Sequence, residues 1–443
     1  MPIQDIWASE RLDSTGIPTI QTKMTTEHGR FASLVPSSAP GEANDVCQLR
    51  DGVRGINGGK GVSRAVQGIN EIIRPALIGL EPATQLKEID RLMRKLDSTT
   101  NLSNLGANAI LSVSMCAARA GAQASGLPLY KFIAKEAGMS LYNSVMPVPF
   151  MVVLKGRQNS SNKINFREFM IAPIGAASFR EAVRLNTETY ECLKNVIFEK
   201  DSGFTIDDQG RFVLLPRAPS YPLDLLVEAI RRAGHEGRIK IGINAAGQAF
   251  ERNGLYDAGD GSQECWTRSQ LISLYQDLAK KYPILLLEDP FGHDDWMTWT
   301  SLNASFKNEL ELVGGALLLS NPERLQYAKR SAACNALLLK ITQIGTISDS
   351  LAIAKEAFNS GFSVVVSHSS SETTDDFLAD LTVGLRAGHL KSGAPCRGEH
   401  VVKYNRLMEI EETFLQYGLP QNCLYAGKAF EDAGDLLARC HLT

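Results

Sequence analysis

From residue 168 onward, short apolar runs alternate with stretches that have the periodicity of amphipathic helices, and this alternation constrains the fold most. The predicted strands are rich in Leu, Ile and Val, and they cover residues 168–173, 238–244, 284–289, 314–321, 335–340, 363–368 and 388–393. The helical patterns between several of them cover residues 221–234, 269–282, 322–332, 346–361 and 377–388. Uniformly apolar strands need cover on both faces of their sheet, which indicates an α/β protein. With this many units we expect a closed barrel, and an open, doubly wound sheet is the alternative.

The N-terminal part has a different pattern. Residues 19–37 alternate apolar and polar side chains like a β-hairpin, with His28 and Gly29 at the turn. Helical periodicity follows, and residues 106–126 are apolar around most of the helix, which predicts a buried helix. We therefore expect a small α+β domain over residues 1–140 and an α/β barrel domain over residues 141–443.

Composition and charge exclude several functional classes. The 443 residues are 44% hydrophobic and 21% charged with a formal net charge of -3, so nucleic acid and anionic membranes are not expected partners. The first residues lack the basic and apolar segments of a signal peptide, and no apolar run is long enough to span a bilayer. The eight cysteines show no C-x-x-C spacing. Together these features predict a cytoplasmic protein with reduced thiols.

Polar side chains lie where the predicted strands end. The carboxyl ends of parallel barrel strands meet on one rim, and active sites of such barrels form there. The residues at these ends are Asn244, Glu288, Asp289, Lys340, Ser367, His368 and Lys391, whereas the run that starts at Gly314 offers only Gly315 and Ala316. Several carboxylates and lysines on one rim would indicate an acid–base site with a metal, whereas a rim with fewer carboxylates than lysines would indicate a different kind of site.

Several long motifs resemble the enolase (phosphopyruvate hydratase) family along nearly the whole chain. They include "DSTGIPT", "GANAILSVS", "EFMIAPIGAASFREA", "LLLEDPFGHDDW", "NALLLKITQIGTISDS" and "KSGAPCRGEHVVKYNRLMEIEE". The resemblance implies a small α+β domain followed by an eight-stranded (β/α)8 TIM-type barrel that is not a perfect parallel repeat. It also implies dehydration of 2-phosphoglycerate to phosphoenolpyruvate, with a lysine base, a glutamate pair and two Mg²⁺ ions that stabilise the enolate-like intermediate.

Some functional positions of the family are retained here. By resemblance, Lys340 is the base, Lys391 contacts the substrate, and Glu168 belongs to the glutamate pair. Glu288 matches a metal-ligand carboxylate. His368 and Ser370 match substrate-binding positions.

Other positions depart from the family pattern. Asn244 and Gly315 stand where the resemblance places two metal-binding aspartates, and Gln209 stands where it places the second catalytic glutamate. Ser369 replaces a phosphate-binding arginine, and Asn159 replaces a mobile histidine. In the first loop, Pro40 takes the place of a metal-binding serine.

These departures predict weak or lost Mg²⁺ binding and a pseudoenzyme with a binding or structural role. Two alternatives stay open: an active phosphopyruvate hydratase, and a lysine base that acts on a different carboxylate. Lacking a metal pair, Lys340 and Lys391 are expected to pair with Glu168 and Glu288. A homodimer, or a heterodimer with an active paralogue, is implied by the resemblance, together with a small phosphorylated or carboxylate ligand.

Overall fold

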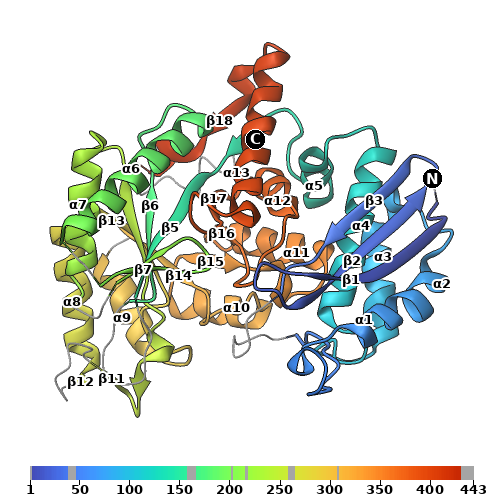
Figure 1. Ribbon diagram of the computed structural model, residues 1–443, viewed down its shortest axis with the longest axis horizontal. Coiled ribbons are helices and arrows are strands. Elements are labelled where there is room, and N and C mark those ends of the chain that lie inside the picture. Colours follow the sequence, from blue (N-terminus) through green and yellow to red (C-terminus); the bar gives the residue numbers. More distant parts are fainter. Residues whose placement is uncertain are drawn as a thin grey trace.

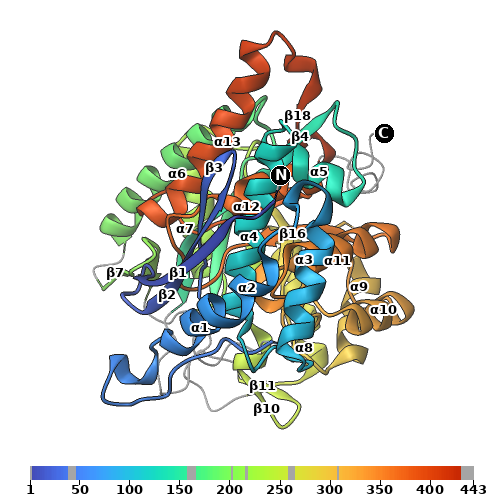
Figure 2. The ribbon, with the colours of Figure 1, turned by 90° about the vertical axis from the view of Figure 1, so that its right-hand side faces the viewer.

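The computed structural model describes residues 2–37, 46–156, 166–200, 203–214, 218–257, 265–306 and 309–430. A sheet with helices behind it forms the N-terminal part, and a barrel with an outer layer of helices forms the rest (Figure 1). Figure 2 looks onto the N-terminal part, with the barrel behind it.

The N-terminal sheet is an antiparallel meander of β1 (Asp5–Leu12), β2 (Pro18–Thr26) and β3 (Gly29–Leu34). Thr26 pairs with Gly29, so the predicted hairpin and its turn are confirmed. Buried and more exposed side chains alternate along the C-terminal half of β2, because one face of the sheet packs on helices and the other lies toward solvent.

Helices cover the inner face of this sheet. The helices that contact its strands are α1 (Ser63–Gly68), α2 (Arg74–Leu77) and α4 (Ala107–Ala124), and the π-turn η2 (Ile69–Ile73) joins α1 to α2. Two further helices, α3 (Pro82–Asp97) and α5 (Leu129–Ala137), pack on α4. Nearly all side chains of α4 are buried, as its Ala-rich sequence predicted. Small side chains let it pack closely between the sheet and the neighbouring helices.

Eight described strands close into a ring. In order around the barrel they are β5 (Val148–Gly156), β6 (Glu168–Ala172), β9 (Lys240–Asn244), β13 (Ile284–Glu288), β14 (Glu311–Gly314), β15 (Ala336–Leu339), β16 (Ser363–Ser367) and β17 (Gly388–Lys391). The ring closes where β17 pairs with β5, so the barrel is confirmed and the open sheet is wrong. Only β6 is antiparallel to both of its neighbours in the ring.

One predicted strand is wrong. Residues 314–321 form a turn rather than a strand, and β14 ends at Gly314. Leu319 and Ser320 have φ values of 50° and 53°, which a strand cannot accommodate. Leu317 and Leu318 are buried all the same, so core packing explains the apolar run that suggested a strand.

The outer layer confirms the predicted helices. It consists of α6 (Phe179–Lys200), α7 (Tyr221–Arg232), α8 (Arg268–Lys281), α9 (Trp296–Phe306), α10 (Pro322–Ser331), α11 (Ile347–Asn359), α12 (Phe377–Leu385) and α13 (Gly398–Gln416) (Figure 1). Their starts follow local rules: Thr267 and Gln270 form a capping box at α8, and Asn321 caps α10 just before Pro322. No helix in the described ranges has both the length and the apolar character needed to cross a membrane.

Partly buried ion pairs and a β-bridge join the two parts. Arg119 of α4 contacts Asp375 and Asp376 at 2.8 Å each, and Ser37 bridges to Ser371. The segment 369–376, which follows β16, is thus fixed against the N-terminal part. The predicted boundary between residues 140 and 141 stays a prediction.

Candidate functional site

A cavity of about 660 Å³ opens at the carboxyl ends of the parallel barrel strands. Because β6 runs antiparallel, its first residue, Glu168, lies on the same rim. The cavity is lined by ten of the eleven predicted site residues: Glu168, Gln209, Asn244, Glu288, Gly315, Lys340, His368, Ser369, Ser370 and Lys391. Asn159, the eleventh, and Pro40 lie outside the described residues.

Lys391 holds both retained glutamates. Its Nζ lies 2.8 Å from Glu168 Oε2 and 2.7 and 3.0 Å from the two carboxylate oxygens of Glu288. Burial would lower the pKa of Lys391, but the two carboxylates outweigh burial and raise it. This confirms the predicted pairing for three of the four groups. Burial raises the pKa of Asp289, and the positive charge of Lys340, the fourth group, offsets part of that rise.

Arg211, which the sequence analysis did not single out, takes the other oxygen of Glu168. Its Nη1 donates to Glu168 Oε1 at 2.7 Å, while its Nη2 and Nε donate to Asp207 Oδ2 at 2.7 and 2.9 Å. Burial would raise the pKa of Glu168, but Lys391 and Arg211 overcome burial and hold the pKa well below its ordinary value. Glu168 is therefore ionised and has cations on both oxygens.

Asn244 completes the contacts of Glu168. Its Nδ2 donates to Glu168 Oε2 at 3.0 Å, and its Oδ1 accepts the backbone N–H of Ala246 at 3.0 Å. The amide thus supplies a donor toward the carboxylate and an acceptor toward the loop. An aspartate could not donate to Glu168, so the amide suits a site in which no metal ion separates these two side chains.

Asp289 fills the space beside Gly315. Its carboxylate accepts the backbone N–H groups of Gly315 and Ala316 at 2.9 Å. A Cβ atom built on Gly315 would lie 2.6 Å from Asp289 Oδ2, so a side chain at position 315 requires Asp289 to move. Burial and the neighbouring Glu288 raise the pKa of Asp289.

Gln209, Ser369 and Ser370 lie together on another side of the cavity. Gln209 Nε2 donates to the carbonyl oxygen of Ser370 at 2.7 Å, whereas Gln209 Oε1 is buried with no hydrogen-bond partner among the described residues. The Ser369 hydroxyl lies 2.9 Å from that of Thr342, and its backbone N–H donates to Glu372 at 2.8 Å.

His368 is a neutral imidazole. Its Nδ1 lies 2.9 Å from the carbonyl oxygen of Lys391, and burial together with the positive charge of Lys391 and contact with His400 lowers its pKa well below the ordinary value. The rings of His368 and His400 stand nearly perpendicular, with 5.4 Å between their centroids. Both are therefore uncharged at neutral pH and contribute no positive charge for a phosphate.

Three further cations reach the cavity that sequence reasoning missed: Lys155, Arg167 and Arg211. Lys155 of β5 is paired in register with Glu168 of β6, and its Nζ lies 3.6 Å from Asp207. Arg167 directly precedes Glu168. Its place next to a predicted site residue was a signal that could have found it, whereas Arg211 depends on how β8 (Phe212–Leu214) pairs with β5.

The residues of the cavity do not fit a pair of Mg²⁺ ions. Within the described ranges, no group of three or more His, Cys, Asp or Glu side chains is placed to hold a metal ion. Mg²⁺ requires several oxygen ligands in octahedral geometry. Here the oxygens of Glu168 and Glu288 already accept from lysine, arginine and amide donors.

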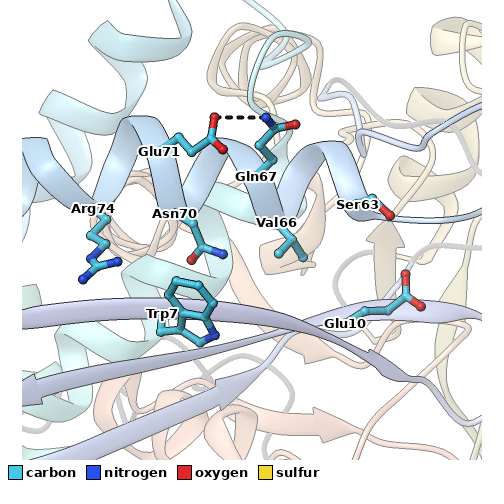
Figure 3. Close-up of a pocket in the computed structure, with 8 residues that line it drawn as sticks. All are labelled: Trp7, Glu10, Ser63, Val66, Gln67, Asn70, Glu71 and Arg74. Carbon is cyan, nitrogen blue, oxygen red and sulfur yellow. Dashed lines mark hydrogen bonds between the residues drawn. The ribbon is translucent and has the colours of Figure 1, made fainter.

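A second cavity, of about 550 Å³, lies on the N-terminal part between β1 and the α1–η2–α2 segment (Figure 3). Much of its polar lining is used locally. Asn70 exchanges hydrogen bonds with the backbone of Ala8 at 2.8 and 3.1 Å, and Gln67 donates to Glu71 at 3.0 Å. The Arg74 guanidinium lies 5.7 Å from the Trp7 ring centroid. We therefore assign the candidate site to the barrel cavity.

Comparison with known proteins identifies the family. The description "Enolase, N-terminal domain" matches residues 3–133, and "Enolase, C-terminal TIM barrel domain" matches residues 143–433. The chain belongs to the enolase family. It is 43% identical to "Enolase" of Mastigamoeba balamuthi over 98% of this chain and 99% of that protein. It is 42% identical to "Enolase" of Eimeria tenella (97% and 99%) and 43% identical to "Enolase 1" of Entamoeba histolytica (98% and 100%).

Membership confirms the fold and the family expected from the motifs. Enolases are lyases that generally use Mg²⁺. In this chain Lys391 contacts both Glu168 and Glu288, and Arg211 contacts Glu168.

Proposed function

We propose that this protein is an enolase-family member without phosphopyruvate hydratase activity, which acts through binding or as a structural partner. One observation carries the proposal: Lys391 and Arg211 neutralise Glu168 and Glu288, the carboxylates that the resemblance assigns to catalysis and metal binding. The positive charge that a metal pair would supply is replaced by side chains of the protein.

Competition between these cations and Mg²⁺ supports the proposal. A metal ion at Glu288 would have to displace Lys391 from both oxygens of that carboxylate. One unit charge at about 4 Å and an effective dielectric near 20 contributes roughly 4 kcal/mol. Asn244 is a neutral amide and Gly315 has no side chain, so neither position supplies a carboxylate charge that would attract the metal ion.

The catalytic positions support it as well. Gln209 cannot donate a proton as a carboxylic acid does, and general acid–base help typically contributes about 10²–10⁴-fold in rate. Ser369 lacks the planar fork with which an arginine binds a phosphate through two hydrogen bonds. Each change alone slows the reaction, and together they remove proton transfer, metal binding and phosphate binding.

A coupled assay on 2-phosphoglycerate with Mg²⁺ tests the proposal. We expect no turnover, and no heat of Mg²⁺ binding at micromolar concentration by titration calorimetry. The comparison variant carries Asn244→Asp, Gly315→Asp, Gln209→Glu and Ser369→Arg, and a second version adds Arg211→Met to free Glu168 Oε1. Turnover by the unmodified protein at an ordinary enzyme rate would overturn the proposal and establish the hydratase alternative.

If the protein does not turn over 2-phosphoglycerate but binds other metabolites, the other alternative becomes testable. In it, Lys340 acts as a base on a different carboxylate. The position of Lys340 in the cavity lining supports this alternative. Screening carboxylates for exchange of a carbon-bound proton in ²H₂O, with Lys340→Met as the control, separates that chemistry from binding alone.

Assembly and location also belong to the proposal. By family resemblance we propose a cytoplasmic homodimer, or a heterodimer with an active enolase paralogue. Light scattering coupled to gel filtration decides between a monomer and a dimer. Co-expression with an active enolase, followed by purification through a tag on this chain, tests the mixed dimer.

A further inference from the structure

The turn that joins α13 to the strand β18 (Cys423–Tyr425) exposes an apolar surface. Large apolar side chains there are between 39% and 82% exposed, and we call them the α13 tip: Tyr142, Leu415, Tyr417, Leu419 and Leu424. In Figures 1 and 2 the end of α13 stands out from the rest of the molecule above β18. The α13 tip is therefore open to contact from another segment or chain.

The parts of the α13 tip lie close together. The backbone N–H of Leu419 donates to the carbonyl oxygen of Phe414 at 2.8 Å, so the turn folds back on the end of α13. Leu424 is paired in register with Val145 of β4 (Ser144–Met146), three positions after Tyr142. Soluble proteins seldom leave a large apolar patch uncovered, and such a patch marks an interaction surface.

The chain itself supplies a segment within reach of the α13 tip. The structure describes the chain as far as Phe430, and residues 431–443 follow it in the sequence. Phe430 is buried in the barrel core, and the 3₁₀ helix η6 (Ala426–Phe430) connects it to β18. Because a 3₁₀ helix rises about 2 Å per residue, residue 431 begins within about 20 Å of Leu424. A chain as long as residues 431–443 spans up to about 40 Å when extended, which is enough to cross the tip.

The sequence of this segment complements the α13 tip. Its apolar residues Ala433, Leu436, Leu437 and Cys440 recur at i, i+3, i+4 and i+7, which is the spacing of one apolar helix face. Such a face is stabilised mainly by packing against another apolar surface. The segment is acidic, whereas residues 413–430 carry one lysine and no acidic residue, so like charges there do not oppose the contact.

We propose that residues 431–443 fold back over the α13 tip and cover it, with Leu436 and Leu437 placed against Tyr417. The segment belongs to the same chain, so the cover does not depend on protein concentration. While it is in place, it keeps this apolar face from binding another chain. The inference goes beyond the proposed function and does not depend on it.

Hydroxyl-radical labelling read by peptide mass spectrometry tests the inference on the full chain and on a chain that ends at Phe430. Tyr417 is 75% exposed in the structure, so cover by the segment should make its labelling several-fold slower in the full chain. Tyr327 of α10 is 46% exposed, and α10 lies far from the tip in both views, so its labelling should be equal in the two chains (Figures 1 and 2).

Two full-length variants test the apolar contact itself. The double variant Leu436→Asp/Leu437→Asp places charges on the apolar face, and its Tyr417 should be labelled as fast as in the shortened chain. Ala438→Asp places a charge away from that face and should leave the labelling of Tyr417 as it is in the unmodified protein.

Equal labelling of Tyr417 in the full and shortened chains overturns the inference. Protection of the full chain that disappears on dilution also overturns it, because a second copy then provides the cover. If shortening changes the labelling of Tyr327, the fold has changed, and the two full-length variants decide. Equal labelling of Tyr417 in Leu436→Asp/Leu437→Asp and in Ala438→Asp refutes the inference.

Discussion

Replacement of Arg211 by methionine gives the sharpest test of the salt-bridge network. The Arg211 side chain is 5% exposed and joins Glu168 to Asp207 through three hydrogen bonds of 2.7 to 2.9 Å. Methionine keeps much of the volume but leaves the buried carboxylate of Glu168 and the partly buried carboxylate of Asp207 without their shared cation. Removing one partner of a buried ion pair typically costs about 3–5 kcal/mol in the free energy of unfolding.

Two features of the structure set where in that range the loss falls. Glu168 keeps Lys391 and Asn244, and Asp207 keeps Lys155 at 3.6 Å together with the backbone N–H groups of Gln209 and Arg211. We therefore expect the lower part of the range, about 3 kcal/mol, measured from urea unfolding followed by near-ultraviolet circular dichroism.

The effect of pH carries a definite sign. The pKa of Glu168 is depressed in the folded protein, so its contribution to stability is present above its unfolded pKa of 4.5 and is lost as pH falls through the folded value. In the variant that pKa rises, and the difference in stability between the two proteins should shrink as pH falls below about 5. Arg184→Met, which removes an exposed ion pair on α6, is the matched control and should change little. A loss below about 1 kcal/mol for Arg211→Met would refute the network as a stabilising element.

Two further predictions concern single sites. Asn244→Asp places a carboxylate against Glu168 Oε2, from which the Asn244 Nδ2 lies 3.0 Å, so we expect a loss of about 1–3 kcal/mol in thermal melts without metal. The same change at exposed Asn253 should have almost no effect, and equal melting of both variants would contradict the prediction. His400 is buried with both ring nitrogens unpaired in the described structure, and burial, with Lys403 and Arg211 nearby, lowers its pKa to about 3. The neutral form of His400 contributes its full stability above the unfolded pKa of 6.5, and this contribution is lost as pH falls toward 3. Between neutral pH and pH 5, the free energy of unfolding should therefore fall by about 2 kcal/mol less in His400→Leu than in the unmodified protein. Parallel stability-versus-pH curves for the two proteins would show that His400 takes up a proton as readily in the folded protein as in the unfolded chain, which would contradict the prediction.

The pattern of the sequence was enough to predict the barrel. Short apolar runs such as residues 336–339 and 363–367 can be buried on both faces only inside a sheet covered by helices, whatever their partners are. The same reasoning gave a wrong strand at residues 314–321, because a buried turn and a buried strand can have the same run of apolar residues. Strand ends located Asn244, Glu288, Lys340, His368 and Lys391, since parallel strands bring their carboxyl ends to one rim, and the family resemblance located the other site residues that line the cavity.

What the sequence by itself determined, then, is the family, the barrel and the uncharged residues Gln209, Asn244 and Gly315 at positions where the resemblance implies acidic groups, because these depend on the order of residue types along the chain. Only the tertiary structure decided which cations contact Glu168 and Glu288. Arg211 reaches Glu168 because β8 pairs with β5 and β5 with β6, a contact between residues 43 positions apart. Ion pairs form between side chains that lie within a few ångströms of each other, whatever their separation along the chain. Arg211, which belongs to no recognised motif, can therefore pair with Glu168, which does.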